Sequence, residues 1–83
     1  MYQVRIIAQA QKDFEKLPSQ VMNRIKKEII LLQSNPRPHG VIKLTQDEGY
    51  RQRVGDYRIL YRIDDHAKEF FIYRIKHRKD VYR

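Results

Sequence analysis

Basic side chains recur at short spacings in the C-terminal part of this 83-residue chain, where they could bind phosphate. In the stretch GYRQRVGDYRILYRID at positions 49–64, Arg51 and Arg53 precede an expected turn and Arg58 follows it. Guanidinium groups present planar forks of donors that match the oxygens of a phosphate. Three of them on neighbouring strands would suit stabilisation of the charge that develops when a phosphodiester is cut. Ordinary solvated surface is the alternative interpretation.

Groups able to transfer protons follow near the C-terminal end. RNA can be cut without a metal ion, because its own 2′-hydroxyl attacks the adjacent phosphate once a base removes the hydroxyl proton and an acid protonates the leaving oxygen. Histidine as a residue type is suited to such transfer, which makes His77 a candidate, and nearby cations would lower the pKa of Tyr82. Arg78 lies between them and adds a cation. A surface histidine and a tyrosine packed on the sheet remain the alternative interpretation.

Other catalytic chemistries find little support in the residues. The three histidines, His39, His66 and His77, lie in separate segments without the spacing of metal ligands. Ser19 and Ser34 fall at expected helix ends, where capping explains them. The sequence has no cysteine and no Gly-rich phosphate loop before a helix. We therefore expect neither a metal ion nor a cofactor.

The formal net charge of +8 favours an anionic partner, which would be nucleic acid, an anionic membrane or an acidic protein. Residues 49–83 hold ten Lys and Arg against five Asp and Glu, and seven of the ten are Arg. The longest apolar run, at 29–32, is far too short to cross a membrane, and the N-terminus lacks the apolar segment of a signal peptide. Together with the absence of cysteine, these features predict a cytoplasmic protein with no membrane association.

The first half of the chain predicts one strand followed by two helices. Alternating apolar residues indicate a strand over 2–8. Ala10, Phe14 and Leu17 then recur at helical spacing, and a second amphipathic helix extends to about Ser34. The Pro- and Gly-containing segment 35–40 ends that helix.

The second half predicts three antiparallel strands. Strands on either side of Gly55-Asp56 form a hairpin, because both residues favour turns. A further strand covers 69–76, and strict alternation there would group Phe71 and Tyr73 with Ile75. Residues 41–44 predict either a short edge strand or part of the lead-in to the hairpin, and residues 47–49 predict a turn. We therefore expect one domain over 1–83, an α+β fold with both helices on one face of the sheet and the arginines near the other.

Together these segments resemble the RelE/ParE superfamily of bacterial toxins from toxin–antitoxin pairs, and the resemblance covers nearly the whole chain. It rests on AQKDFEKLP after the first strand, NPRP after the long helix, KL before a turn, GYRQRVGDYRILYRID, and the closing IKHRKDVYR. It implies the same arrangement, in which helices lie on one side of a curved antiparallel sheet.

In the RelE branch, the resemblance implies a ribosome-dependent, metal-independent endoribonuclease. Such a toxin cleaves mRNA in the ribosomal A site, leaves a 2′,3′-cyclic phosphate and so inhibits translation. Arginine cannot act as a base, so proton abstraction would fall to Tyr82 or His77. The candidate catalytic residues are Arg51, Arg53, Arg58, His77, Arg78 and Tyr82. Further expected RNA contacts are Lys43, Arg74 and Lys76.

The resemblance also implies partners and leaves two alternatives open. A small antitoxin encoded beside the toxin, acidic or partly disordered, would mask the cationic face. The ribosome and mRNA would be the other partners, and we expect no sequence-specific binding of DNA by this chain. The ParE branch has the same fold but inhibits DNA gyrase and cleaves no RNA. A degenerate toxin that only binds antitoxin or RNA is the third possibility.

Overall fold

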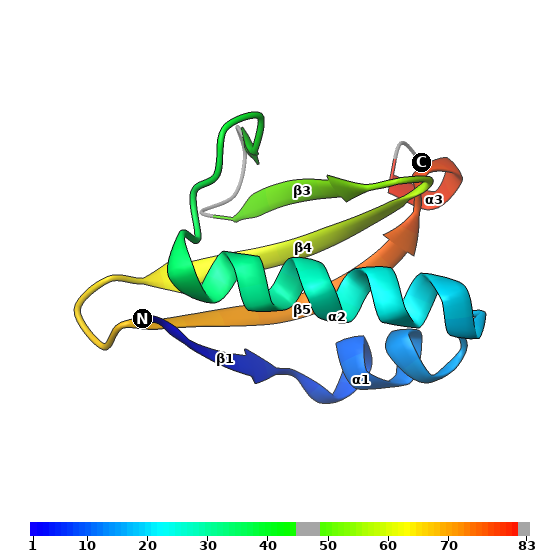
Figure 1. Ribbon diagram of the computed structural model, residues 1–83, viewed down its shortest axis with the longest axis horizontal. Helices are drawn as coiled ribbons and strands as arrows, with labels where there is room; N and C mark the ends of the chain where they lie inside the picture. The colour runs from blue at the N-terminus through cyan, green and yellow to red at the C-terminus, as the bar shows by residue number, and fades with distance from the viewer. Residues whose placement is uncertain (45–48, 82–83) are drawn as a thin grey trace.

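A computed structural model of the chain describes residues 1–44 and 49–81, and Figure 1 shows the arrangement of its helices and strands. The elements in chain order are β1 (Gln3–Ile6), α1 (Ala8–Glu15), α2 (Ser19–Ser34), β2 (Ile42–Lys43), β3 (Tyr50–Val54), β4 (Tyr57–Asp64), β5 (Glu69–His77) and α3 (Arg78–Val81). The turn expected at 47–49 extends into residues outside the described part of the chain. Among the helices described, none has the length and apolar character needed to cross a membrane.

The strands form one five-stranded sheet in the order β1-β5-β4-β3-β2. The pairs from β5 to β2 are antiparallel, whereas β1 joins β5 in parallel. Figure 1 shows α2 lying across one face of the sheet, with α1 beside β1. The predicted α+β fold with helices on one face is confirmed. The three predicted antiparallel strands are confirmed as β3, β4 and β5, and the sheet as a whole is mixed because β1 runs parallel to β5.

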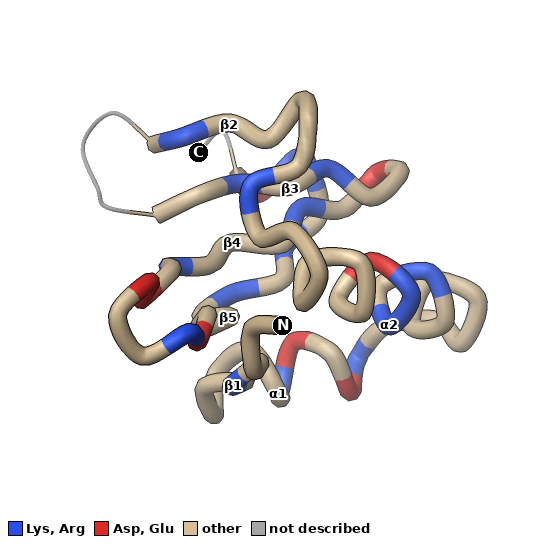
Figure 2. The backbone as a smooth tube through the Cα atoms, turned by 60° about the vertical axis from the view of Figure 1, so that its left-hand side comes forward, with Lys and Arg blue, Asp and Glu red and all other residues tan. Residues whose placement is uncertain are grey.

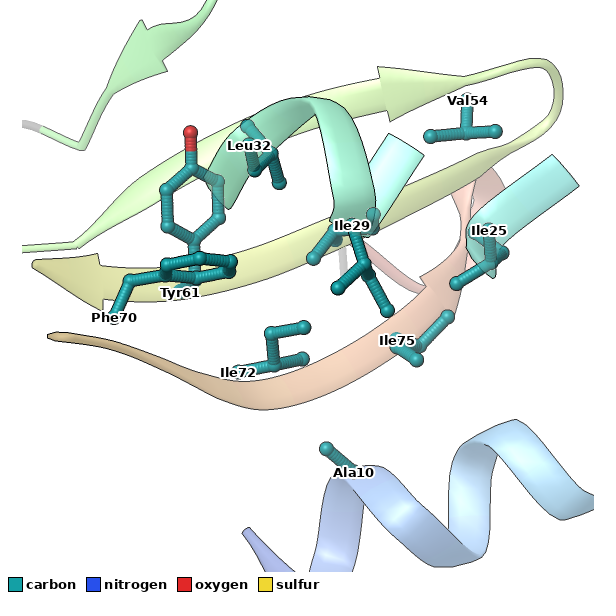
Figure 3. Close-up of a cluster of buried hydrophobic side chains, with 10 residues drawn as sticks. Ala10, Ile25, Ile29, Leu32, Val54, Tyr61, Phe70, Ile72 and Ile75 are labelled. Carbon is teal, nitrogen blue, oxygen red and sulfur yellow. The ribbon is translucent and has the colours of Figure 1, made fainter. Parts of the chain in front are cut away.

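The core lies between α2 and the sheet (Figure 3). Ile25, Ile29 and Leu32 form the buried stripe of α2 at spacings of four and three residues, as an amphipathic helix requires. Ala10 is fully buried on α1. The strands supply the remaining members of the buried cluster, which are Val54, Ile59, Tyr61, Phe70, Ile72 and Ile75.

The hairpin between β3 and β4 depends on Gly55. Val54 pairs with Tyr57, so Gly55 and Asp56 form a two-residue loop. Gly55 has a φ of 60°, whereas Asp56 is not among the described residues with positive φ, which matches a type II′ turn. A Cβ atom on Gly55 would lie 2.7 Å from Nη1 of Arg24 on α2. The positive φ favours glycine at this turn, whereas the Arg24 guanidinium, at the end of a flexible side chain, could move to admit a larger residue.

A β-bulge changes the alternation of side chains within β5. Leu60 pairs with Arg74 and Tyr61 pairs with Ile72, so Tyr73 is the extra residue. Phe70 and Ile72 therefore face the core before the bulge, and Ile75 faces it afterwards. The predicted grouping of Ile75 with Phe71 and Tyr73 was wrong, because strict alternation does not continue through a bulge.

Candidate functional site

The sheet register aligns three basic residues in a row across three strands. Arg53 of β3 is directly opposite Arg58 of β4, and Arg58 is directly opposite Lys76 of β5. Neighbouring strands lie about 4.8 Å apart, so each cation is adjacent to the next. In Figure 2, Lys and Arg segments recur along the strands, while acidic segments lie in helices, turns and strand ends. We call Arg53, Arg58 and Lys76 the basic row. Arg51 lies beside the row, two residues before Arg53 on β3.

These side chains project from the face of the sheet opposite α2. The neighbours of the β3 arginines identify the other face, because Gln52 donates to Glu28 of α2 at 2.7 Å and Val54 is in the core. Side chains alternate along a strand, so Arg51 and Arg53 point away from α2. Arg51, Arg53 and Arg58 line one open cleft of about 240 Å³ together with Gly40 and Ile42, which we call the arginine cleft. The structure therefore brings the three predicted arginines together on the sheet face opposite α2.

Arg58 is fixed in place by the hairpin that carries it. Arg58 is 8% exposed and is therefore buried, whereas Arg51 is half-buried and Arg53 is exposed. Nη1 of Arg58 donates to the carbonyl oxygens of Gly55 at 3.0 Å and Tyr57 at 2.8 Å. One guanidinium nitrogen makes both bonds, so within residues 1–44 and 49–81 the other N–H donors of the planar group remain for an anion in the cleft.

Arg74 lies close to the basic row in sequence but makes a different contact. Its Nε donates to Oδ2 of Asp13 on α1 at 2.8 Å, and the backbone N–H of Ile75 donates to the same oxygen at 3.0 Å. Burial raises the pKa of Asp13, but the bonds from Arg74 and Ile75 outweigh this effect and leave the pKa lowered. Asp13 therefore joins α1 to the end of β5.

Lys43 is separated from the arginine cleft by the alternation of β2. Lys43 pairs with Tyr50, while Ile42 pairs with Arg51. Tyr50 stacks on the buried ring of Tyr61, with ring centroids 5.9 Å apart. Because paired residues share a face of the sheet, the Lys43 side chain projects from the face that α2 covers. The Ile42 side chain projects from the face that carries Arg51.

His77 lies in a second cleft, outside the arginine cleft. Arg74 and Lys76 also line this cleft of about 590 Å³, together with Asp13 and Tyr57. The Tyr57 and His77 rings meet edge to face at 5.2 Å. Nδ1 of His77 accepts a bond from the N–H of Lys79 at 3.2 Å. His77 follows Lys76 on β5, so its side chain projects from the face of the sheet opposite to that of Lys76.

The last two predicted residues lie beyond the sheet. The Arg78 N–H donates to the Asp56 carbonyl at 2.7 Å, and Arg78 Nε lies 3.9 Å from Asp56 Oδ1. These contacts attach the start of α3 to the tip of the β3–β4 hairpin. Tyr82 lies outside the described residues. The site predicted as one cluster is therefore divided among the described residues, with Arg51, Arg53 and Arg58 in one cleft and Arg74, Lys76 and His77 in another.

Sequence reasoning missed two residues of the arginine cleft, Gly40 and Ile42. The Val41 N–H donates to the Pro38 carbonyl at 3.1 Å, and Gly40 has a φ of 89°, as in a type II turn. The spacing of Pro38 and Gly40 is a sequence signal for that turn, although it does not show what the turn packs beside. Over residues 1–44 and 49–81, no three His, Cys, Asp or Glu side chains gather as a group able to hold a metal ion.

Known proteins resemble this chain along nearly its whole length. Residues 4–82 match the family described as the ParE toxin of the type II toxin–antitoxin system parDE. Toxin RelG of Mycobacterium tuberculosis is 35% identical over 85 residues, which cover 99% of this chain and 97% of that protein. The archaeal RelE–RelB complex from Pyrococcus horikoshii contains a chain that is 32% identical, with a TM-score of 0.83 and coverage of 93% of this chain and 94% of that one.

A third relative comes from the RelBE2 toxin–antitoxin complex of Mycobacterium tuberculosis. It is 30% identical with a TM-score of 0.78, and the match covers 92% of this chain and 96% of that one. The predicted resemblance is confirmed at the level of both sequence and fold. The chain therefore belongs to the RelE/ParE superfamily of toxins from type II toxin–antitoxin systems.

Proposed function

We propose that this toxin is a metal-independent endoribonuclease that cleaves mRNA in the ribosomal A site and so stops translation in the cytoplasm. The observation that carries the proposal is the basic row, in which Arg53, Arg58 and Lys76 are neighbours on three strands. Three adjacent cations on an open sheet face suit a polyanionic strand and are unfavourable without one. Relatives that share the fold are toxins by name.

The basic row would act on the phosphate that is cut. The 2′-oxygen forms a bond to phosphorus, and the bond from phosphorus to the 5′-oxygen breaks, which yields a 2′,3′-cyclic phosphate and a free 5′-hydroxyl. Extra negative charge develops on the non-bridging oxygens during this step. The guanidinium of Arg58, already held by Gly55 and Tyr57, can donate to those oxygens with little reorganisation. Arg51 and Arg53 would hold the flanking phosphates.

Proton transfer completes the reaction. We assign removal of the 2′-hydroxyl proton to Tyr82, while solvent water protonates the leaving 5′-oxygen. Tyr82 follows α3 in the sequence, and α3 is attached to the β3–β4 hairpin through Arg78 and Asp56. Cations lower the pKa of a phenol that lies near them. His77 lines the other cleft with Asp13 and Tyr57, so we assign it a supporting role at the start of α3. Tyr82→Phe should then abolish cutting, whereas His77→Gln should retain most of it.

An antitoxin is the proposed protein partner. The chain has a net charge of +8, so an acidic segment would be attracted to the basic face and would neutralise it. The solved relatives include chains taken from RelBE2 and RelE–RelB complexes, which pair a toxin with an antitoxin. We expect the antitoxin to block the arginine cleft. The ribosome and mRNA are the proposed targets of the free toxin.

The test is a primer-extension map of mRNA in a purified translation system, with toxin added and ribosomes either present or omitted. We expect cuts at fixed positions within codons, only with ribosomes, and unchanged by a metal chelator. Arg51→Gln should weaken cutting, while the matched change Arg5→Gln, far along the sheet on β1, should not. Intact mRNA with folded toxin would overturn the proposal.

The second candidate function is inhibition of DNA gyrase without RNA cleavage. The observation in its favour is the match of residues 4–82 to the ParE family. A supercoiling assay with purified gyrase distinguishes the two. Gyrase inhibition at stoichiometric toxin, combined with intact mRNA, would favour this candidate. The basic row would then serve to bind an acidic protein surface or DNA rather than a reacting phosphate.

A further inference from the structure

An apolar side chain stands at the rim of the arginine cleft. Ile42 on β2 is 48% exposed, pairs in register with Arg51, and lines the cleft beside Arg51, Arg53 and Arg58. A single exposed isoleucine is ordinary on a protein surface. What distinguishes Ile42 is its place, because the other lining side chains described in that cleft are all guanidinium groups and Gly40 has none.

The backbone holds Ile42 in this position from two sides. The Pro38–Val41 turn, with Gly40 at a φ of 89°, starts the strand, and β2 pairs with β3 at Ile42 and Lys43. Because Ile42 shares a face with Arg51, it is one strand spacing, about 4.8 Å, from that arginine. Isoleucine is also stiff at χ1, so little side-chain freedom is lost when it contacts a ligand.

The two kinds of group in the cleft suit the two parts of a nucleotide. Cations bind phosphate and carry no information about the base. Proteins that bind single-stranded nucleic acid stack unpaired bases on aromatic rings or guanidinium planes, and apolar side chains also pack against an extruded base. An aliphatic group next to phosphate-binding arginines is therefore placed to cover the face of the base whose phosphate the arginines hold.

We propose that Ile42 packs against an RNA base beside the cut and makes the toxin prefer a purine there. The inference depends on the proposed endoribonuclease function and adds to it a residue that selects the substrate. A purine has the larger face and gains more from apolar contact than a pyrimidine does. The arginines set how tightly RNA binds, and Ile42 sets which nucleotide is favoured.

The experiment uses the purified translation system with a series of mRNAs that differ only in the A-site nucleotides. Cutting rates are measured for wild type, Ile42→Ala, Ile42→Thr and Ile42→Leu. Ile42→Thr keeps the β-branched shape that suits a strand and replaces a methyl group with a hydroxyl. It therefore tests the loss of apolar surface even if Ile42→Ala disturbs β2. Leu keeps the apolar surface. Ile30→Ala is the matched control, since Ile30 is 62% exposed on α2 and lies outside the cleft.

We expect the ratio of purine to pyrimidine cutting to fall about fivefold in Ile42→Ala and Ile42→Thr. Ile42→Leu and Ile30→Ala should keep the wild-type ratio. A wild-type toxin that cuts, with the same ratio in every Ile42 variant, would overturn this inference and leave the endoribonuclease proposal standing. A folded wild-type toxin that never cuts would overturn both.

Discussion

Arg58 of β4 and Lys76 of β5 are directly opposite each other in the sheet, so two positive charges form one cross-strand pair. Like charges in this arrangement oppose folding. Arg53 adds a third charge on the other side of Arg58. A phosphate bound to the row should therefore stabilise the folded state, because the anion offsets the repulsion between the three cations.

Neutralising the end of this row should make the toxin more stable and less active. We expect Lys76→Gln to raise the free energy of unfolding by about 0.2–1 kcal/mol, since it removes one like-charge pair. The same change should slow mRNA cutting, because one phosphate-binding cation is lost. Urea unfolding and primer extension measure the two effects. Lys27→Gln, on the exposed side of α2, is the control and should change neither. A destabilised Lys76→Gln would contradict the repulsion argument.

The geometry of Arg58 should matter beyond its charge. Its guanidinium donates to two carbonyl oxygens and still has donors for an anion, which a lysine ammonium at this position cannot reproduce. We expect Arg58→Ala to slow cutting about 100-fold or more and to relieve growth arrest. Arg58→Lys should restore only a small part of the rate. Arg5→Lys on β1 is the matched control, and full activity of Arg58→Lys would show that charge alone suffices.

The hydroxyl of Tyr61 should contribute to stability through one buried bond. Tyr61 is fully buried and donates to the Pro36 carbonyl at 2.6 Å, which attaches the loop after α2 to the sheet. Burial also raises the pKa of this phenol, so it stays a donor at neutral pH. We expect Tyr61→Phe to lower the free energy of unfolding by about 1–3 kcal/mol, because the buried carbonyl loses its partner.

Tyr2→Phe is the comparison for this measurement. The Tyr2 hydroxyl donates to Asp65 at 2.7 Å in an exposed contact, where water can replace it. Its loss should cost no more than about 0.5 kcal/mol in the same urea experiment. Equal costs for the two variants would contradict a special contribution from the buried bond.

The contact between Asp65 and Arg37 should make stability depend on pH in the acid range. Two N–H groups of Arg37 donate to the Asp65 carboxylate at 3.0 and 2.8 Å, and Tyr2 donates as well. The Arg37 bonds, followed by the Tyr2 bond, lower the pKa of Asp65 from 3.8 to about 2. The carboxylate is thus harder to protonate in the folded state than in the unfolded one. Its contribution is complete above pH 3.8 and is lost as the pH falls through about 2.

Thermal unfolding of wild type and Asp65→Asn tests this dependence. We expect wild type to have the higher Tm, with a constant difference between pH 5 and 8. The difference should narrow below about pH 4 and close near pH 2. Other carboxylates, including Asp13, titrate equally in both proteins and cancel in the comparison. A difference that stays constant down to pH 2 would exclude the ionised Asp65 as its cause.

Local patterns in the sequence predicted most of the fold. The apolar spacing of α2 and the turn at Gly55 and Asp56 determine the two elements that enclose the core, and alternation along β3 predicted the face of Arg51 and Arg53. These features are local, since each depends on residues within one or two turns of helix or strand. The placement of Arg51, Arg53 and Arg58 on one face of the sheet could therefore be predicted from the sequence.

Features that depend on contacts between distant segments could not be predicted in the same way. The parallel pairing of β1 with β5 joins residues 3–6 to 69–72, and nothing local specifies its direction. Ile42 enters the cleft because its strand pairs with β3, although the two-residue strand has almost no pattern of its own. His77 faces the second cleft because the bulge at Tyr73 sets the alternation of everything that follows it in β5.

The extra residue in β5 has a consequence for how related toxins are compared. Removing one residue at Tyr73 would leave Ile75 facing inward and Lys76 outward, because the strand would then alternate regularly from end to end. A relative with a shorter β5 should therefore be aligned with its gap at the bulge, beside Tyr73. That alignment matches Lys76 with the side chain that occupies the outer place in the basic row of the relative.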